Sequence, residues 1–282
     1  MVRRKLGWVS LCLVIMFFAM SSRGWGFLIS PSRLDIELSA GEEREFSLYL
    51  ANPQERDNIR VKIYTEDFFV RRDGSLEFLR PGSLRWSCAE WITFEDTEVV
   101  LKPGEEKKIG GTIKVPKDAS GGRYALVMVE LVPAGESENT KRRSGIRFSI
   151  LVSALINPDE LERALEIVGF EVLDQEEKEA TTVGENYKEV RLVVSVENTG
   201  NVQVVAKGSV SVRNKAGRVE AIVPLLAGGG TIFPVCIRDF NGVIPKPLPD
   251  GEYMGEAEIR YDEGKSAKAE INFTLKNNRL MK

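Results

Sequence analysis

Apolar and polar residues alternate with a period of two along most of the chain. Residues 34–38 (LDIEL) are a clear example, and similar runs follow at 46–50 and 59–63. Such alternation is typical of a β-strand with one buried face. Residues 72–75 (RDGS) separate two short apolar runs and predict a hairpin turn. Because no segment after the first 26 residues has a helical period, the pattern predicts an all-β fold.

The expected strands form two groups, separated at 157–160, where Pro158 and polar neighbours interrupt the pattern. In the first group the expected strands are 34–38, 46–50, 59–63, 68–70, 76–78, 91–94, 99–101, 109–115, 124–131 and 146–156. In the second group they are 167–173, 190–196, 202–212, 219–225, 232–237, 253–261 and 267–275. We therefore expect one domain at 27–157, another at 158–275, and a polar tail at 276–282.

Both groups repeat the same order of signature residues. Each has an asparagine at the end of an early strand (Asn52 and Asn198), then a proline, then a Gly-x-Tyr segment that opens a long strand (Tyr124 and Tyr253). Short strands in this arrangement predict two tandem immunoglobulin-like β-sandwich domains. We expect both tyrosines to be structural, with each hydroxyl bonded to nearby backbone.

The first 26 residues have the layout of a secretory signal peptide. Residues 3–5 are basic, residues 6–20 are almost wholly apolar, and small and polar residues follow. This apolar run is shorter than the roughly 20 residues that a membrane-spanning helix needs. The sequence thus predicts an exported protein, periplasmic or at the cell surface, with no membrane span in the mature chain. An uncleaved N-terminal anchor is the alternative.

Composition narrows the classes of function. The chain has no histidine, which excludes Ser-His and Cys-His nucleophile pairs and imidazole metal sites. Its net charge is −3, and the predicted signal peptide contains basic residues and no acidic one, so the mature chain is more acidic and a poor partner for nucleic acid. We expect no catalytic residues, no metal and no cofactor. A hydrolase with a pair of carboxylates is the enzyme class left open.

Two cysteines remain after removal of the signal peptide, one in each expected domain. Cys88 and Cys236 therefore cannot form a bridge within a domain. One interpretation is a pair of buried thiols that act as small hydrophobic residues. The other is a disulfide between the domains, which an exported protein permits.

Three segments of the first domain follow one another in a recognisable order. They are residues 32–33 (SR) in the first strand, residues 46–52 in the second, and residues 99–105 (VVLKPGE) before a strand that ends at Pro116. This pattern resembles the N-terminal domain of periplasmic pilus-assembly chaperones, over most of the first domain. Residues 102–131 also resemble immunoglobulin-like domains of Gram-positive surface proteins. The resemblance implies a sandwich fold and a binding role.

In these chaperones two basic residues hold the terminal carboxylate of the bound subunit, and the resemblance places Arg33 at the first position. The second is expected in the closing strand, 146–156, but the stretch near Leu151 has no lysine, and Arg147 fits only in another register. A single arginine can still bind a carboxylate through two parallel N–H bonds. The alternative for Arg33 is an ordinary surface residue over a strand.

The closing strand has a further interpretation. Ile146, Phe148, Ile150 and Val152 alternate on one face, as in chaperones that lend a strand to an incomplete subunit. The alternative is that this face packs on the core of its own domain. Leu151 and Leu155 make the opposite face apolar as well near the end of the strand, which favours a contact with a partner or with the second domain.

Two tryptophans flank residues 87–90. If this segment is a strand, Trp86 and Trp91 point to opposite faces, so at most one belongs to the core. Trp91 fits the core, because it adjoins the apolar run that follows it. Trp86 is then exposed and available to stack on a sugar ring or a peptide.

The leading hypothesis is a non-catalytic, exported protein of the cell envelope that pairs with another envelope or surface protein through its first domain. A first alternative is a glycan-binding or wall-associated structural module. A second alternative is an assembly chaperone for pilus or surface subunits.

Overall fold

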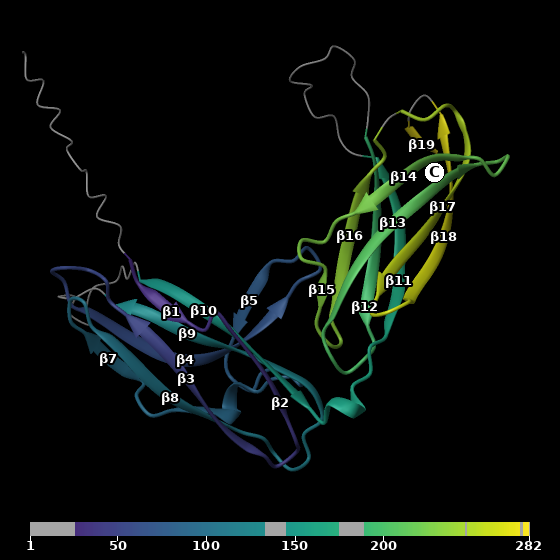
Figure 1. The fold of residues 1–282 in the computed structure, drawn as a ribbon. Coiled ribbons are helices and arrows are strands. Elements are labelled where there is room, and N and C mark those ends of the chain that lie inside the picture. The colour runs from purple at the N-terminus through teal and green to yellow at the C-terminus, as the bar shows by residue number, and fades with distance from the viewer. Residues whose placement is uncertain (1–25, 133–144, 175–188, 246, 277–278, 282) are drawn as a thin grey trace, which may run out of the picture.

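The computed structural model of the chain describes residues 26–132, 145–174, 189–245, 247–276 and 279–281 (Figure 1). Apart from residue 26, the predicted signal peptide lies outside this described part. Among the described residues the helices are two short 3₁₀ turns, η1 (Ala89–Trp91) and η2 (Pro158–Glu160). The remaining regular structure is strand, so the all-β prediction is confirmed.

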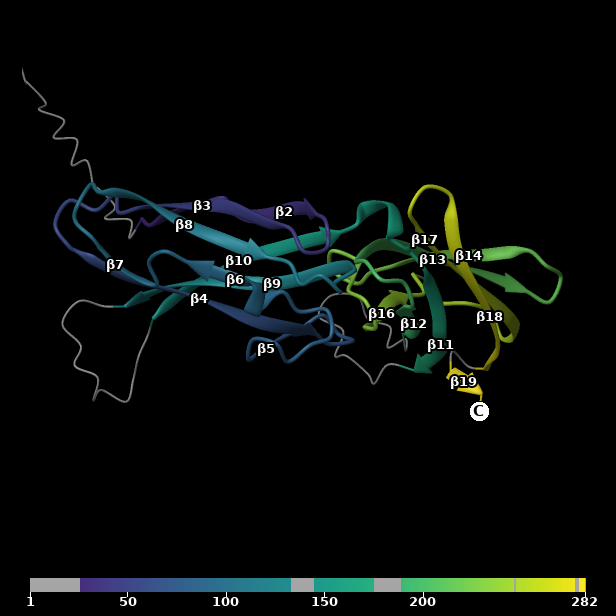
Figure 2. The same cartoon turned by 90° about the horizontal axis from the view of Figure 1, so that it is seen from below.

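The first sandwich consists of two facing sheets. One sheet has the order β1 (Leu28–Ser30), β3 (Glu43–Ala51), β8 (Glu106–Lys114) and β6 (Ile92–Phe94). The other has the order β2 (Arg33–Leu38), β10 (Ile146–Ile156), β9 (Gly121–Val132), β4 (Ile59–Val70) and β5 (Leu76–Leu79), and β7 (Glu98–Leu101) also pairs with β4. Figure 2 shows β3 and β8 on one side of the core and β4 and β5 on the other.

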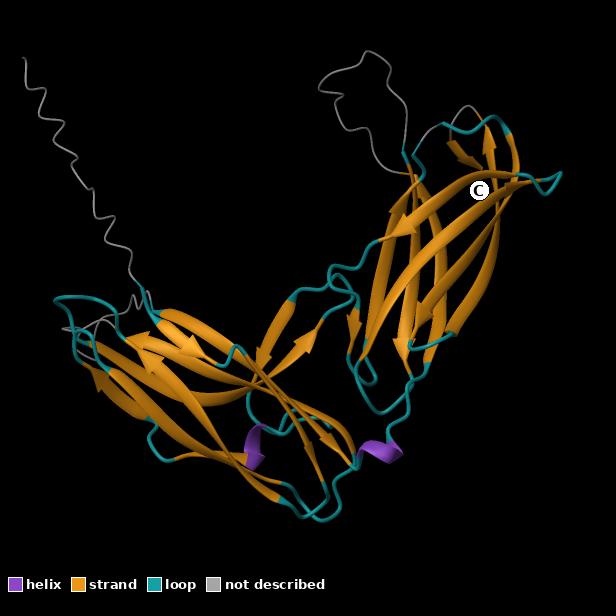
Figure 3. Ribbon diagram, viewed as in Figure 1, coloured by secondary structure: helices purple, strands orange, loops and turns teal. Residues whose placement is uncertain are grey.

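The second sandwich repeats this plan. One sheet has the order β11 (Leu165–Asp174), β12 (Val190–Asn198) and β16 (Ile237–Val243). The other has the order β14 (Val219–Leu225), β13 (Val204–Asn214), β17 (Gly251–Tyr261), β18 (Lys265–Lys276) and β19 (Arg279–Met281), with β15 (Thr231–Ile232) on β13. Figure 3 shows the two sandwiches meeting at an angle near η2. The prediction of two immunoglobulin-like domains is confirmed.

The C-terminal residues differ from the expected polar tail. Instead of ending at residue 275, β18 continues to Lys276, and β19 pairs with it as a short hairpin. The backbone N–H of Leu280 also donates to Asp174 Oδ1 at 2.9 Å, which ties the end of the chain to β11.

The repeated asparagine has the same task in both sandwiches. Asn52 Nδ2 donates to the carbonyls of Asp57 and Leu101, and its Oδ1 accepts from the backbone of Gln54. In the second sandwich Asn198 Nδ2 donates to the carbonyls of Val202 and Ile232, and its Oδ1 accepts from the backbone of Gly200. Both side chains are buried, at 1% and 0% exposure. In each sandwich the side-chain amide therefore bonds backbone N–H and C=O groups of loop residues that have no partner in a neighbouring strand.

The N-terminal strand divides between the two sheets of the first sandwich. β1 pairs antiparallel with β3, and after a cis Ser30–Pro31 bond the chain crosses over and β2 pairs parallel with β10. This crossover decides which part of β10 has a neighbour on both sides.

Candidate functional site

The first half of β10 is a free strand edge. β9 pairs with β10 along its whole length, from Ile146 to Ile156. On the other side, β2 covers β10 only from Leu151 onward. Within the described part of the chain, residues 146–150 have no neighbouring strand on that side. Such an edge presents unpaired N–H and C=O groups that a further strand can use.

The inner face of β10 becomes progressively more buried along the strand. Ile146 is 47% exposed, whereas Ile150 and Val152 are each 1% exposed and belong to the core of the first sandwich. Phe148 is intermediate and stacks on Phe27 with ring centroids 5.6 Å apart. The expectation that all four side chains face a partner needs correction, because Ile150 and Val152 pack on the domain's own core. Ile146 and part of Phe148 remain accessible.

The opposite face of this sheet is turned toward the second sandwich, and we call it the inter-domain face. Its buried members Leu126 and Met128 belong to a hydrophobic cluster that continues into the second sandwich. Leu151 and Tyr64 are partly buried against the same cluster. The contact of Leu151 with this cluster explains one apolar member of the second face that the sequence predicted for β10.

A polar cluster lies at the outer end of the inter-domain face. The Tyr64 hydroxyl donates to Glu130 Oε2 at 3.2 Å, and Arg147 Nη1 lies 4.0 Å from Glu66 Oε1. The Arg147 guanidinium also lies 5.9 Å from the centre of the Phe78 ring. Glu66 Oε2 is buried without a hydrogen-bond partner. Burial raises the pKa of the Glu66 carboxyl, while the charge of Arg147 opposes this shift.

We expect Glu66→Gln to raise the free energy of unfolding at neutral pH, by less than about 1 kcal/mol. The raised pKa means that the folded protein holds this proton more tightly than the unfolded chain does, so the ionised carboxylate opposes folding above the folded-state pKa. This cost disappears as the pH falls through that pKa, and the advantage of the variant should vanish with it. Urea denaturation of both proteins across the acidic range tests this, and a less stable variant at neutral pH would contradict it.

Arg33 lies at the start of β2, directly opposite Leu151 of β10. Its Nε is 2.7 Å from Asp35 Oδ1, and the side chains are 43% and 60% exposed. The residue across the ladder is a leucine, so β10 supplies no second basic group beside Arg33. Arg147 does not replace it, because it lies toward the other end of β10 beside Glu66.

The two repeated tyrosines differ in their contacts. The Tyr253 hydroxyl donates to the carbonyl of Pro249 at 2.6 Å, which confirms the predicted bond to nearby backbone. For Tyr124 the prediction is wrong, because its hydroxyl accepts from the backbone N–H of Gln203, at 2.7 Å, in the second sandwich. Tyr124 therefore links the two domains and does not bond to nearby backbone of the first sandwich.

The expectation of an exposed Trp86 is also wrong. Trp86 is 4% exposed and packs between the sandwiches, stacked on Phe233 at 5.5 Å and edge-on to Phe68 and Tyr124. Trp91 instead is partly buried against the first core, with the Arg123 guanidinium 5.9 Å from its ring. A buried Trp86 has no free ring face for a sugar, so the glycan hypothesis loses its stacking residue.

The β4–β5 hairpin forms a second contact between the domains that sequence reasoning missed. Arg72 Nη2 donates to Ser195 Oγ at 2.6 Å, and Arg72 Nε lies 3.1 Å from Asp239 Oδ1. The backbone N–H of Asp239 donates to the carbonyl of Arg72 at 2.9 Å. Buried Arg238 reaches back to the carbonyl of Arg71. The turn predicted at residues 72–75 is therefore also a docking element.

Both cysteines are free and buried. Burial raises the pKa of the Cys236 thiol to about 11 and also raises that of Cys88. The interpretation as buried hydrophobic thiols is confirmed, and the alternative disulfide is not formed.

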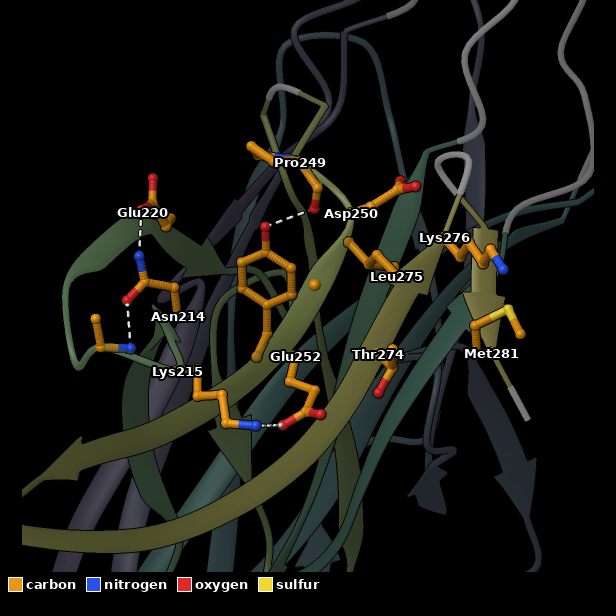
Figure 4. Close-up of a pocket in the computed structure, with 13 residues that line it drawn as sticks. Asn214, Lys215, Glu220, Pro249, Asp250, Glu252, Thr274, Leu275, Lys276 and Met281 are labelled. Atoms are coloured by element: carbon orange, nitrogen blue, oxygen red, sulfur yellow. Dashed lines mark hydrogen bonds and ion pairs between the residues drawn. The ribbon is translucent and has the colours of Figure 1, made fainter.

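A depression of about 980 Å³ lies at the far end of the second sandwich (Figure 4). Its polar side chains are largely engaged with neighbours. Lys215 Nζ is 3.0 Å from Glu252 Oε2, and Asn214 Nδ2 donates to Glu220 Oε1 at 2.8 Å. These four polar side chains are thus paired with one another.

The described residues contain neither a cluster suited to a metal ion nor a helix suited to a membrane span. In these ranges no group of three or more His, Cys, Asp or Glu side chains could hold a metal ion. No helix of the described residues is long and apolar enough to cross a bilayer.

Comparisons with known proteins find similar chains among solved structures. No family model matches this chain, and no curated protein matches it. Among solved structures, the class 5 fimbriae chaperone CfaA is similar at 15% identity, with a TM-score of 0.47, over 86% of this chain and 98% of that chain. The CsuC–CsuE chaperone–tip adhesion subunit complex of Acinetobacter baumannii gives 16% identity and a TM-score of 0.42, over 87% and 98% of the two chains.

The CupB2 chaperone of Pseudomonas aeruginosa gives 12% identity and a TM-score of 0.40, over 86% of this chain and 98% of that chain. Each of these solved structures is or contains a chaperone, and the sequence identity to this chain lies between 12% and 16%.

Proposed function

We propose that this chain is a non-catalytic binding protein of the cell envelope, acting in the periplasm as an assembly chaperone for a surface subunit. The observation that supports it is the free edge of β10 at residues 146–150. Main-chain groups on a free edge give affinity for an extended segment, and alternate side chains give specificity. Ile146 and Phe148 are the alternate side chains that remain accessible there.

The position of β2 favours one direction for the added segment. β2 runs parallel to β10 and begins with Arg33 opposite Leu151. A segment that pairs with residues 146–150 in the same direction would extend the line of β2, and its C-terminal end would meet Arg33. An arginine binds a carboxylate through charge-assisted hydrogen bonds. The partner segment is therefore a C-terminal strand with alternating apolar residues and a free carboxylate.

Hydrogen exchange tests this proposal directly. The probe is a set of short synthetic peptides with alternating apolar and polar residues and a free C-terminus, and the control has the same composition with its apolar residues in one block. Binding of the alternating peptides should slow amide exchange in residues 146–150 by about tenfold or more. Residues 151–156 should change little, because β2 and β9 already pair with them. Binding without protection at 146–150, or no binding by any alternating peptide, would refute the proposal.

A further inference from the structure

β1 and the free edge of β10 border the same open side of the first sandwich. Among the described residues β1 is the last strand of its sheet and pairs only with β3. Beyond Ser30 the chain crosses to the facing sheet, where β2 pairs with β10 from Leu151 onward. One sheet therefore ends with β1 on this side of the sandwich, and the other ends with residues 146–150.

Phe27, which immediately precedes β1, fills part of this open side. Its ring stacks on the ring of Phe148, with centroids 5.6 Å apart and an angle of 30° between the ring planes. Phe27, Ile29 and Phe148 are each partly buried against the core of the first sandwich. The two rings thus come from the edges of facing sheets and meet in the layer between them. Because this layer is only about 10 Å thick in a sandwich, they leave little depth for a third ring.

A strand added to β10 would direct one side chain into this layer. In the existing pairing Leu34 of β2 lies opposite Val152 of β10, and both side chains pack against the core. A segment that continues the line of β2 keeps this alternation, so its residue opposite Phe148 also points inward. Neighbouring strands lie about 4.8 Å apart, so the inward side chain would contact Phe148 and the ring of Phe27 together.

We propose that Phe27 sets the size of the partner side chain that is accepted opposite Phe148. This inference rests on the proposed function and adds a selective position to it. A branched aliphatic side chain such as that of valine fits beside the two rings, whereas an aromatic side chain has to displace one of them. Such overpacking of apolar side chains is unfavourable. The partner segment therefore carries valine, isoleucine or leucine at this position, and not phenylalanine or tryptophan.

A series of peptides that differ in side-chain size tests the role of Phe27. The probes are alternating peptides as described above, with alanine, valine or phenylalanine at every inward position and the same charged residues at the outward ones. A slip of two residues along the edge then leaves the same side chain opposite Phe148. Wild type should bind the valine peptide about tenfold or more tightly than the phenylalanine peptide.

Substitution of Phe27 should change this order. Phe27→Ala leaves a space of the size of a ring, so the ratio of valine to phenylalanine affinity should fall about tenfold or more. Phe27→Leu, a milder change, should give an intermediate ratio. Each ratio is measured within one protein by titration, so a general loss of stability does not imitate the effect.

A matched control removes another ring from the same core. Phe46 on β3 is also partly buried against this core and lies edge-on to Phe94, with centroids 6.0 Å apart. Phe46→Ala should keep the wild-type ratio, because its ring has no contact with Phe148 among the ring pairs of the described residues.

The outcomes separate the two hypotheses. If no peptide of the series slows amide exchange at residues 146–150 of wild type, the proposed function fails. If the valine peptide protects these residues but Phe27→Ala keeps the wild-type ratio, this inference alone fails. A preference of wild type for the phenylalanine peptide would overturn it too. Equal weakening of all three peptides in Phe27→Ala would do the same, because the ring would then support the edge without selecting a side chain.

Discussion

Phe233→Ala is expected to separate the unfolding of the protein into two transitions. Phe233 is 5% exposed, and its ring centroid lies 4.9 Å from that of Tyr124, 5.0 Å from Phe68 and 5.5 Å from Trp86. Removal of a buried phenylalanine side chain costs about 3 to 5 kcal/mol. Here three of its ring partners belong to the other sandwich, so the loss falls mainly on the coupling between the domains. Calorimetry of wild type and variant measures the number of transitions.

A matched control distinguishes coupling from general stability. Phe273→Ala also removes a buried ring, which stacks on Tyr253 at 5.6 Å within the second sandwich. This variant should lower the stability of the second sandwich without altering the angle between the domains. X-ray scattering should show a wider range of shapes for Phe233→Ala only. If Phe233→Ala unfolds in one transition with unchanged scattering, the hairpin contacts of Arg72 are sufficient to couple the domains.

The second large effect is expected at the repeated asparagine. Asn198→Ala removes two donated hydrogen bonds and one accepted bond at a site with 0% exposure. Each buried polar group left without a partner costs about 1 to 3 kcal/mol. We therefore expect a loss of roughly 3 kcal/mol or more in the free energy of unfolding. Urea denaturation of the whole protein, followed by circular dichroism, measures it.

Asn52→Ala provides the internal comparison. Asn52 makes the same three kinds of hydrogen bond in the first sandwich, at 1% exposure. The two variants should lose similar amounts of stability, each mainly in its own domain. Tolerance of alanine at one site and not at the other would show that the two asparagines are not structurally equivalent.

The order of apolar and polar residues was enough to predict the strands and the repeated asparagine, because both depend on residues close together in the sequence. Period-two alternation identifies strands because a pleated strand with one buried face requires it. The shared position of Asn52 and Asn198 is visible in the sequence because each bridges loops at the same point of a repeated plan. The free edge of β10 was not visible, because it depends on where β2 joins the sheet.

The wrong expectation for Trp86 has a specific cause. The two-residue period of a strand does not hold across residues 86–91, because η1 occupies Ala89–Trp91. The exposure of Trp86 therefore does not follow from its separation from Trp91 in the sequence. The partners of Trp86 and Tyr124 in the second sandwich are also far away in the sequence, as are Arg72 and Asp239, which are separated by 167 positions. No single-sequence pattern reports such pairs.

The candidate site was only partly predictable for the same reason. Arg33 and the alternation of Ile146 and Phe148 were visible as a strand motif. Which side chains of β10 are accessible depends on Phe27 and the opposite sheet, not on the strand itself.

The divergent use of the two tyrosines bears on how this protein can be cut or recombined. Tyr253 satisfies its hydroxyl within its own half, whereas Tyr124 depends on Gln203 in the other. A fragment ending near residue 157 would expose Tyr124, Trp86 and Phe68 together to water. Such an N-terminal fragment should aggregate on expression. The C-terminal half would keep the hydrogen bond from Tyr253 to Pro249. A gene fusion that borrows only the N-terminal half would therefore have to supply a substitute for Phe233 and its loop.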